Sequence, residues 1–269
     1  MIEAKAVNFA YHRGEPVIND ITCKIEDGEF VALLGHNGSG KTTLSRLFMA
    51  LVHPRSGDIF VDGDNIEKLE PADLAHQVGY VFQNPDLQIL EDTVFAEVAY
   101  GPRCKKLSET AIKEQVQAAL QAMGLENLAD AYPRTLSFGQ KRRLGVAAAL
   151  ALNPRTLILD EITNGQDEQE KDDMMDYLQK LNKEKRITII LITHDMNIAR
   201  QYAKRAIVLN DGNLVFDGTT QDLYNGVRDL KEWGLTQPIM AILSAAFIIS
   251  APTVEDFCEK LCLKEGGER

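Results

Sequence analysis

The chain has 269 residues, of which 45% are hydrophobic and 26% charged, a composition typical of a globular protein with its own core. Asp and Glu number 40 and Lys and Arg 29, so the formal net charge is -11. A protein that binds the phosphate backbone of nucleic acid usually carries the opposite sign, so we expect no nucleic-acid partner. The length suits one large domain, alone or with a small appendage.

Hydrophobic patterns along the chain predict strands first and then an alternation of strands and helices. The predicted strands are 2–9, 17–25, 30–34, 156–159, 187–192, 206–209 and 213–216. The predicted helices are 42–51, a segment between Ser108 as N-cap and Gly124 as C′ residue, and 140–152. This order indicates an α/β core with an antiparallel side layer. Beyond about Asp222 only helical periodicity remains, so we divide the chain into a main domain, 1–221, and a small helical C-terminal region, 222–269.

The chain shows no signal-peptide pattern, and we expect it to be cytosolic. Its longest apolar run, 239–251, is shorter than the about 20 residues that a membrane-spanning helix needs. We favour packing of this run in the core of the C-terminal region, because short apolar helices usually bury themselves locally; a contact surface for another subunit is the alternative. Cys258 and Cys262 would share one face of a helix. We expect reduced thiols there, packed as small apolar groups, rather than a metal or redox pair.

The segment Gly35-His36-Asn37-Gly38-Ser39-Gly40-Lys41-Thr42 fits the phosphate-loop pattern G-x-x-x-x-G-K-[ST] at every fixed position. A predicted buried strand precedes it and a predicted helix follows. The glycines let backbone N–H groups surround an anion at the helix N-terminus. Lys41 brings a positive charge to the β- and γ-phosphates, and the Thr42 hydroxyl is an oxygen ligand suited to Mg²⁺. His36 and Asn37 occupy variable positions, so we assign them backbone amides only.

Two acidic residues follow the apolar strand predicted at 156–159. Asp160 stands at the strand tip, where a carboxylate beside the phosphate loop can hold Mg²⁺. Side chains alternate along a strand, so Glu161 points in a different direction and can orient or deprotonate the attacking water. The pair therefore predicts hydrolysis of a nucleoside triphosphate rather than transfer to a bound acceptor.

Further segments resemble the motifs of ATP-binding cassette (ABC) ATPases and follow the family's order over about 1–218. They are the signature Leu136-Ser137-Phe138-Gly139-Gln140, the Q-loop around Gln83, the D-loop Asn164-Gly165-Gln166-Asp167, the H-loop around His194, and Tyr11 in the place of an adenine-stacking aromatic residue. The resemblance implies an α/β P-loop NTPase fold with a RecA-like core, an antiparallel β subdomain and a helical subdomain at about 86–153. It also implies a dimer that holds two ATP molecules between its subunits, each signature reaching the ATP of the other subunit.

The same resemblance implies roles for individual residues. The residues expected to act in catalysis are Glu161, His194, Gln83 and Lys41. Those expected to hold Mg²⁺ are Thr42, Gln83 and Asp160. Those expected to contact ATP are Tyr11, Gly35, His36, Asn37, Gly38, Ser39, Gly40, Lys41, Thr42, Thr43, Ser137, Gly139 and Gln140. In this scheme His194 contacts the γ-phosphate and supports Glu161, while the Gln83 amide senses Mg²⁺ and the attacking water.

A narrower resemblance is to the ATPases of energy-coupling factor (ECF) transporters and their cobalt and nickel relatives. It rests on Gln83-Asn84-Pro85-Asp86-Leu87-Gln88, Thr93-Val94, Ala99-Tyr100-Gly101-Pro102 and the tail 229–238. It implies a peripheral ATPase on the cytoplasmic face of the cell membrane, paired with a second ABC ATPase subunit that is the same or a paralogous chain. The pair would dock under an integral membrane coupling subunit, which joins it to a membrane substrate-binding subunit for a vitamin or metal ion.

Three positions depart from the ABC pattern: Phe138 replaces a glycine, Ile162 a proline and Gln166 a leucine. We expect the Phe138 benzyl group to face the partner subunit and to weaken the site that this signature completes. Three functions therefore stay open. The chain is an ATPase that drives micronutrient uptake, a regulatory and weakly hydrolysing half of a heterodimer, or a soluble ABC ATPase outside transport.

Overall fold

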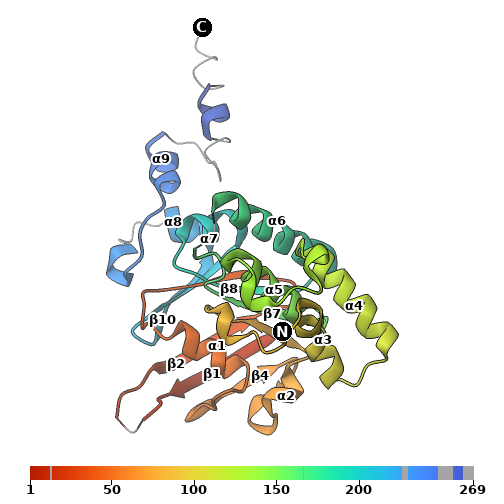
Figure 1. Cartoon of the computed structure of the whole chain (residues 1–269). Helices are drawn as coiled ribbons and strands as arrows, with labels where there is room; N and C mark the ends of the chain where they lie inside the picture. Colours follow the sequence, from red (N-terminus) through yellow and green to blue (C-terminus); the bar gives the residue numbers. More distant parts are fainter. Residues whose placement is uncertain (13, 166, 226–229, 248–256, 263–269) are drawn as a thin grey trace.

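The structure is a computed structural model, and it describes residues 1–12, 14–165, 167–225, 230–247 and 257–262. Its described part contains two sheets, with helices around the larger one (Figure 1). The larger sheet has six strands in the order β10-β9-β3-β8-β7-β6, and the smaller has four in the order β2-β1-β4-β5. The α/β fold with an antiparallel side layer is therefore confirmed.

The larger sheet carries the residues of the predicted site at one edge. Its strands are β3 (Phe30–Leu34), β6 (Val78–Val81), β7 (Thr156–Asp160), β8 (Thr188–Ile192), β9 (Arg205–Asn210) and β10 (Asn213–Thr219). All pair in parallel except β10, which forms an antiparallel hairpin with β9. Every residue of β3, β7 and β8 is buried, as expected of strands that are covered on both faces. The carboxyl ends of the parallel strands meet at one edge, and Gly35, Gln83 and Asp160 lie there.

The smaller sheet covers one face of the larger one. It consists of β1 (Ile2–Phe9), β2 (Ile18–Ile25), β4 (Ser56–Val61) and β5 (Asp64–Asn65), all antiparallel. A core between the two sheets contains Ile21 and Ile59 from the smaller sheet, Leu33 from β3 and Leu47 from α1 (Lys41–Phe48). The helix that follows the phosphate loop is therefore packed between the sheets, which holds the loop at a defined place.

Helices cover the other face of the larger sheet. They are α3 (Val94–Cys104), α4 (Glu109–Ala122), α5 (Phe138–Leu150), α6 (Glu168–Lys185) and α7 (Met196–Tyr202); the short α2 (Pro71–Leu74) lies beside the smaller sheet. Short 3-10 turns are η1 (Ile66–Lys68), η2 (Pro85–Leu87), η3 (Glu126–Leu128) and η4 (Pro133–Thr135). Ala32 and Leu34 of β3 belong to the core under these helices, whereas Val31 and Leu33 belong to the core between the sheets. This alternation is the two-residue period of a buried strand.

Most predicted elements are confirmed, with ends that differ by a few residues. The Ser108 hydroxyl accepts a hydrogen bond from the Ala111 N–H, and Gly124 follows the helix with φ of 62°, so both predicted caps of α4 are present. Elements in segments for which no element was predicted include β4, β6, α3, α6 and α7. β4 begins with the exposed residues Ser56, Gly57 and Asp58, which hide its strand pattern.

The C-terminal region starts on the main core and then leaves it. It contains α8 (Thr220–Asn225), η5 (Leu230–Trp233) and α9 (Ile239–Phe247). Leu230 and Trp233 are buried in the core under the helices, whereas α9 stands away from the body of the molecule (Figure 1). On α9, Ala241 is buried but Ile242 and Phe247 are half exposed. The apolar run thus contains both packed and exposed side chains; its last residues, 248–251, lie outside the described ranges, and the boundary at 221 stays a prediction.

The two cysteines near the C-terminus do not pack as predicted. Cys258 and Cys262 lie in the helical segment 257–262 and are exposed free thiols, so the prediction that they pack as small apolar groups is wrong. Phe257 and Leu261 of this segment pack with Leu243 of α9 instead. In the part of the chain that the structure describes, no helix is long and apolar enough to cross a bilayer.

Candidate active site

The phosphate loop lies between the end of β3 and the start of α1. Gly35, Gly38 and Gly40 have φ of 148°, 87° and 104°, values that favour glycine. A Cβ at Gly35 would come 2.2 Å from the Leu209 carbonyl oxygen, so no side chain fits there. The loop therefore wraps closely around the N-terminus of α1, where backbone N–H groups and the helix dipole favour an anion.

Lys41 lies inside this loop and is buried. Its Nζ donates to the Gly35 carbonyl oxygen at 2.8 Å and to the His36 carbonyl oxygen at 2.9 Å. Burial lowers the pKa of Lys41, and the nearby carboxylates of Glu161 and Asp160 oppose that shift. The side chain thus holds a positive charge at the centre of the loop, where it can meet the phosphates of a nucleotide.

A cleft of about 300 Å³ opens in front of the loop. Besides the loop itself, its walls include Thr43, Gln83, Asp160 and Glu161. The tertiary structure therefore gathers at one place residues that lie far apart in the sequence, as the pattern of strands predicts. The Gln83 side chain is exposed at the rim of this cleft.

Two oxygen donors suited to a hard cation stand side by side in the cleft. The Thr42 hydroxyl lies 3.4 Å from Asp160 Oδ2, and the Tyr80 hydroxyl donates to the same oxygen at 2.8 Å. Burial raises the pKa of Asp160, and the hydrogen bond from Tyr80 opposes that shift. Burial beside Asp160 raises the pKa of Tyr80, so the phenol keeps its proton and donates. A hydroxyl and a carboxylate in contact fit Mg²⁺, which prefers oxygen ligands.

Tyr80→Phe is expected to weaken metal binding about tenfold, because the hydrogen bond from the Tyr80 hydroxyl orients the carboxylate of Asp160. The substitution keeps the ring and removes the hydroxyl. Binding of Mn²⁺ to the ATP-loaded protein, followed by electron paramagnetic resonance, measures this affinity directly. Tyr100→Phe, at an exposed tyrosine of α3, is the control and should leave the affinity unchanged. Equal Mn²⁺ affinities for the two variants would show that Tyr80 does not position the metal ligand.

Glu161 lies at the mouth of the cleft with its carboxylate held in place. Its φ is 52°, and its N–H donates to the Ile192 carbonyl oxygen at 2.9 Å. Glu161 Oε2 pairs with His194 Nδ1 at 2.8 Å and accepts from Asn164 Nδ2 at 2.9 Å. The Glu161 side chain is 8% exposed and the His194 side chain 58%, so the imidazole reaches out beside a sheltered carboxylate. Both bonds go to one oxygen, which leaves Oε1 able to accept a proton from water.

Tyr11 and His36 flank the loop from the outside. The Tyr11 hydroxyl lies 3.2 Å from Thr43 Oγ1 and accepts from Arg46 at 3.2 Å, while nearly half of the side chain is exposed. Tyr11 is thus available as a stacking surface at the predicted place. The His36 side chain is turned away from the cleft, since its Nε2 lies 3.2 Å from Asp211 Oδ1. This supports the assignment of backbone contacts alone to His36.

The segment 136–140 forms the N-terminus of α5. Ser137 is the N-cap: its Oγ accepts from the Gln140 N–H at 3.2 Å, and its own N–H donates to Gln140 Oε1 at 2.9 Å. The serine hydroxyl can still donate its proton to an anion in front of the helix. A Cβ added at Gly139 would come 2.6 Å from Glu170 Oε2, so this glycine has a carboxylate of its own chain against it.

Part of the Phe138 ring packs on its own chain. Its ring lies 4.7 Å from the guanidinium carbon of Arg142, and a Cβ at Gly165 would come 3.2 Å from its edge. The side chain is 43% exposed. The packed part of the ring connects the signature segment to the predicted D-loop, and the contact of its exposed part with a partner subunit stays a prediction. Gln166, the neighbouring departure in that loop, lies outside the described residues.

Comparison with known proteins decides the family. Residues 18–164 match the ABC transporter family. The chain belongs to this family. It is 41% identical over 250 residues to the energy-coupling factor transporter ATP-binding protein EcfA2 of Clostridium perfringens. The aligned region covers 90% of this chain and 88% of that relative. This ABC ATPase therefore binds ATP and couples its hydrolysis to transport.

Two solved structures of ABC proteins share the fold. CbiO1 of Clostridium perfringens, part of the ABC transporter complex CbiONQ, superposes with a TM-score of 0.78 at 33% identity over 91% of this chain and 98% of its own. The dimeric cassette MJ0796, in a post-hydrolysis state with ADP and Pi, superposes with a TM-score of 0.75 at 29% identity, covering 82% of this chain and 99% of that one. The predicted fold class of an ABC nucleotide-binding domain is thereby confirmed.

The signature residues stand apart from the cleft of their own chain. Ser137, Gly139 and Gln140 are absent from the described walls of the cleft in front of the phosphate loop. Lys41, Asp160 and Glu161 line that cleft. His194 contacts Glu161, one of its walls. One ABC ATPase chain thus brings the loop, the acids and the histidine to one cleft, and its signature residues are not among the described walls of that cleft.

Sequence reasoning missed three side chains of this site. Tyr80 bonds Asp160, Asn164 bonds Glu161, and Arg142 donates to the Glu161 and Gln83 carbonyl oxygens. Tyr80 and Asn164 lie within the Q-loop and D-loop segments, so their places in the motifs were a signal. No pattern points to Arg142, because its partners are backbone carbonyls, which every residue carries.

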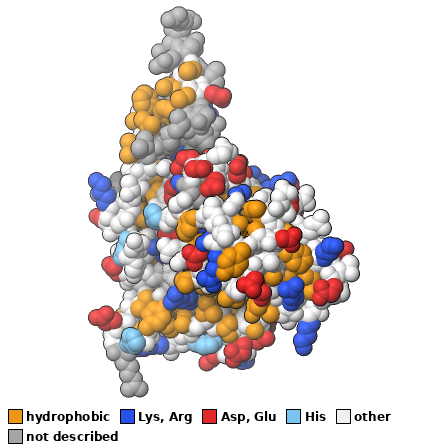
Figure 2. Space-filling view, in the orientation of Figure 1, with side chains coloured by type: hydrophobic (Ala, Val, Ile, Leu, Met, Phe, Trp, Pro, Cys, Tyr) orange, Lys and Arg blue, Asp and Glu red, His pale blue; other side chains and the backbone are white. Residues whose placement is uncertain are grey.

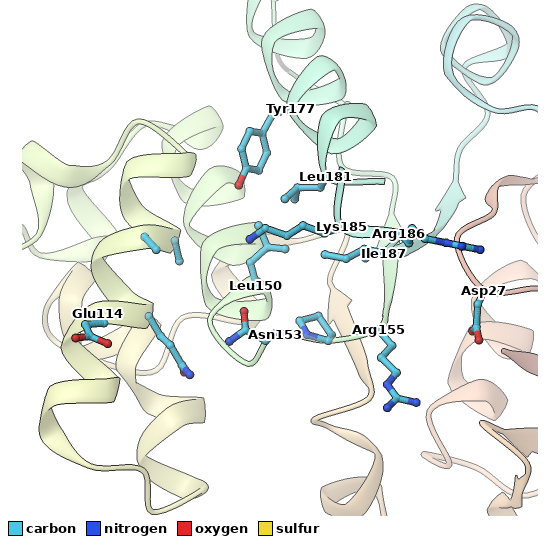
Figure 3. Close-up of a pocket in the computed structure, with 14 residues that line it drawn as sticks. Asp27, Glu114, Leu150, Asn153, Arg155, Tyr177, Leu181, Lys185, Arg186 and Ile187 are labelled. Carbon is cyan, nitrogen blue, oxygen red and sulfur yellow. The ribbon is translucent and has the colours of Figure 1, made fainter. Parts of the chain in front are cut away.

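A larger pocket, of about 590 Å³, lies away from the motifs. Figure 3 shows it between α4, α6 and the segment around Asn153, with the side chains of Tyr177 and Lys185 reaching toward the open space. Acids such as Asp27 and Glu114 and bases such as Arg155 stand apart around its rim. Such a dispersed set of charges has no convergent polar groups, so we assign this pocket no chemistry.

Proposed function

We propose that this ABC ATPase is one of a pair of ATPase subunits in an ECF-type importer for a vitamin or a transition-metal ion. The observation that carries this proposal is the likeness, over nine tenths of the chain, to EcfA2 at 41% identity. The structural likeness to CbiO1, part of the CbiONQ complex, supports the same assignment. The proposal places the chain on the cytoplasmic face of the cell membrane without a span of its own.

The geometry supports a dimer with two shared ATP sites. The tip of α5 presents the Ser137 hydroxyl and the helix N-terminus, a combination suited to a phosphate, yet it does not line its own cleft. A second ABC ATPase subunit, identical or paralogous, would bring its own cleft to this tip. The dimeric cassette MJ0796 shows that a protein of this fold pairs in this state.

Within one site, the chain's own residues would bind and orient the triphosphate. Backbone N–H groups of the phosphate loop and the Lys41 ammonium would hold the β- and γ-phosphates and stabilise the charge that develops on them. Thr42 and Asp160, with Gln83 at the rim, would hold Mg²⁺, which when bound neutralises part of the phosphate charge. Tyr11 would offer its exposed ring to the adenine base.

Glu161 would act as the base that accepts a proton from the attacking water. Asn164 and His194 both bond Oε2, so the carboxylate is held in one orientation and Oε1 would accept the proton. When both ring nitrogens of His194 carry a proton, the Nε2–H group can donate to a phosphate oxygen. The Nδ1–H group then keeps its hydrogen bond to Glu161 Oε2. Water attacks the γ-phosphorus in line with the leaving ADP oxygen, and phosphate is released.

An exposed apolar surface beside the Q-loop supports docking to a membrane subunit. It consists of Phe82, Leu87, Leu90 and Tyr100, all more than two fifths exposed. Hydrophobic side chains gather on the visible face over α3 and α5 (Figure 2). Clustered apolar side chains on a solvent-exposed face mark an interaction site. Because this surface adjoins Gln83 at the rim of the cleft, a subunit bound there would be linked to the state of the nucleotide site.

The test is purification of the full-length chain from detergent-solubilised membranes of its own cells. We expect it to carry along an integral membrane coupling subunit and a substrate-binding subunit. After reconstitution in proteoliposomes, the complex should take up cobalt ions, nickel ions or one of a panel of labelled vitamins only with ATP. Leu87→Asp with Leu90→Asp should abolish the co-purification and leave ATP binding unchanged.

Leu51→Asp, at a half-exposed leucine beyond α1, is the control and should keep the complex intact. A wild-type chain that is recovered without any membrane protein, or a complex that transports no cargo of these classes, would overturn the proposal.

A regulatory, weakly hydrolysing half of a heterodimer is the second candidate. The carboxylate of Glu170 beside Gly139 favours it, because a negative charge at the tip of α5 weakens the attraction of that tip for a phosphate. In this case the chain alone would hydrolyse ATP slowly and a mixed dimer rapidly. The ATPase rate of the chain alone and in the purified complex separates the two candidates.

A further inference from the structure

Arg142 joins three motifs through one buried side chain. It lies on α5 and is 2% exposed. Its Nη1 donates to the Glu161 carbonyl oxygen, and its Nη2 donates to the Gln83 carbonyl oxygen at 3.2 Å. The ring of Phe138, at the tip of the same helix, stacks over the guanidinium at 4.7 Å. A single side chain thus contacts the backbone of the catalytic base, the Q-loop and the signature.

The Q-loop is tied to α5 at two further points. Lys141 Nζ pairs with Asp86 Oδ1 at 2.8 Å. Gln88 Nε2 donates to the Gly145 carbonyl oxygen at 3.1 Å. With the bond from Arg142, the segment from Gln83 to Gln88 is held along α5 from its first turn to its middle. We therefore expect the Q-loop and α5 to move as one unit.

The bond from Arg142 to Glu161 links that unit to the proposed catalytic base. Glu161 has a left-handed backbone conformation, in which a residue other than glycine needs support from its surroundings. Its N–H is held by the Ile192 carbonyl on one side and its carbonyl by Arg142 on the other. A movement of α5 would displace the Glu161 carbonyl through Arg142. The Glu161 carboxylate, which in the proposed mechanism accepts a proton from the attacking water, would turn with it.

We propose that Arg142 is a positioning residue that couples the two ATP sites of the dimer. It ties the tip of α5, which completes the partner's site, to the backbone of Glu161, which serves the site of its own chain. The proposal rests on the shared-site dimer of the proposed function. The flat guanidinium fork suits this task because its two nitrogens reach two carbonyls at once, whereas a lysine ammonium is a single point on a flexible stem.

The test uses two full-length copies joined head to tail, with Glu161→Gln in one copy so that a single site hydrolyses ATP. In the first protein, Arg142→Lys stands in the Glu161→Gln copy, so it can affect the active site only through the signature. In the second, Arg142→Lys stands in the other copy, next to the active Glu161. We expect the maximal rate to fall about tenfold in both, within the usual range of coupling between sites, with little change in KM for ATP.

Arg143→Lys in the same two places is the matched control. Arg143 is the next residue of α5, and its Nη1 donates to the Met123 carbonyl oxygen, within the helical layer. We expect both control proteins to keep the rate of the joined protein with unmodified arginines. The melting temperature of each variant shows that it folds, and Arg142→Met provides a second variant in which neither carbonyl has its partner.

The outcomes separate the two proposals. A joined protein with unmodified arginines that hydrolyses no ATP would contradict the shared-site dimer itself. If it hydrolyses ATP and Arg142→Lys in the Glu161→Gln copy leaves the rate unchanged, Arg142 acts within its own site only and the coupling is refuted. Loss of rate in both arrangements, with the controls intact, supports it.

Discussion

Glu161→Gln is expected to lower the steady-state ATPase rate about 10²- to 10³-fold, within the range found when a general base is removed. The amide keeps the size of the side chain and an oxygen that can accept from Asn164 or His194, but it cannot take a proton from water. ATP binding should persist, because the phosphate loop and Lys41 are unchanged. Phosphate release measures the rate, and titration with a fluorescent ATP analogue measures the affinity.

Glu26→Gln serves as the control for this variant. Glu26 is an exposed acid that pairs with Lys24 at the surface, where such pairs contribute little. Its ATPase rate should match that of the wild type. A Glu161→Gln protein that hydrolyses ATP within threefold of the Glu26→Gln protein would show that another group deprotonates the water, and the assignment of the base would be abandoned.

Lys41→Met is expected to weaken ATP binding about 100-fold and to reduce hydrolysis at saturating ATP by a similar factor, as for the loss of one preorganised donor to the reacting phosphate. The ammonium lies between the Gly35 and His36 carbonyl oxygens and is the positive charge at the centre of the loop. Methionine fills much of the same space without a charge. The affinity for ATP, measured by isothermal titration calorimetry, is the primary readout.

Lys24→Met, at an exposed lysine of β2, controls for the loss of a charge elsewhere. Because Lys41 is buried, the melting temperature of Lys41→Met must be compared with that of the wild type. A folded Lys41→Met protein that binds ATP as tightly as Lys24→Met would mean that the loop is not the triphosphate site. Together the two variants separate ATP binding from hydrolysis. Lys41→Met is expected to lose both, whereas Glu161→Gln is expected to lose hydrolysis and keep ATP binding.

Much of this site was predictable from short stretches of sequence. The phosphate loop needs closely spaced glycines, a lysine and a hydroxyl, so its pattern is contained within eight neighbouring residues. The buried strands β3, β7 and β8 stood out as unbroken apolar runs, since a strand covered on both faces has no polar side. Asp160 and Glu161 followed from their position at the end of such a run. In each case the physical cause is local, and neighbours in the chain suffice to show it.

The supports of the site depended on contacts between distant segments. Tyr80 lies 80 residues from Asp160, and Arg142 lies 59 residues from Gln83, so only the packing of β6, β7 and α5 brings them together. The bonds of Arg142 end on backbone carbonyls, which have no signature in a sequence. The surroundings of Phe138 show the same limit. Its identity predicted a ring at the face of the dimer, which stays a prediction, whereas its packing against Gly165 and Arg142 is visible only in the fold.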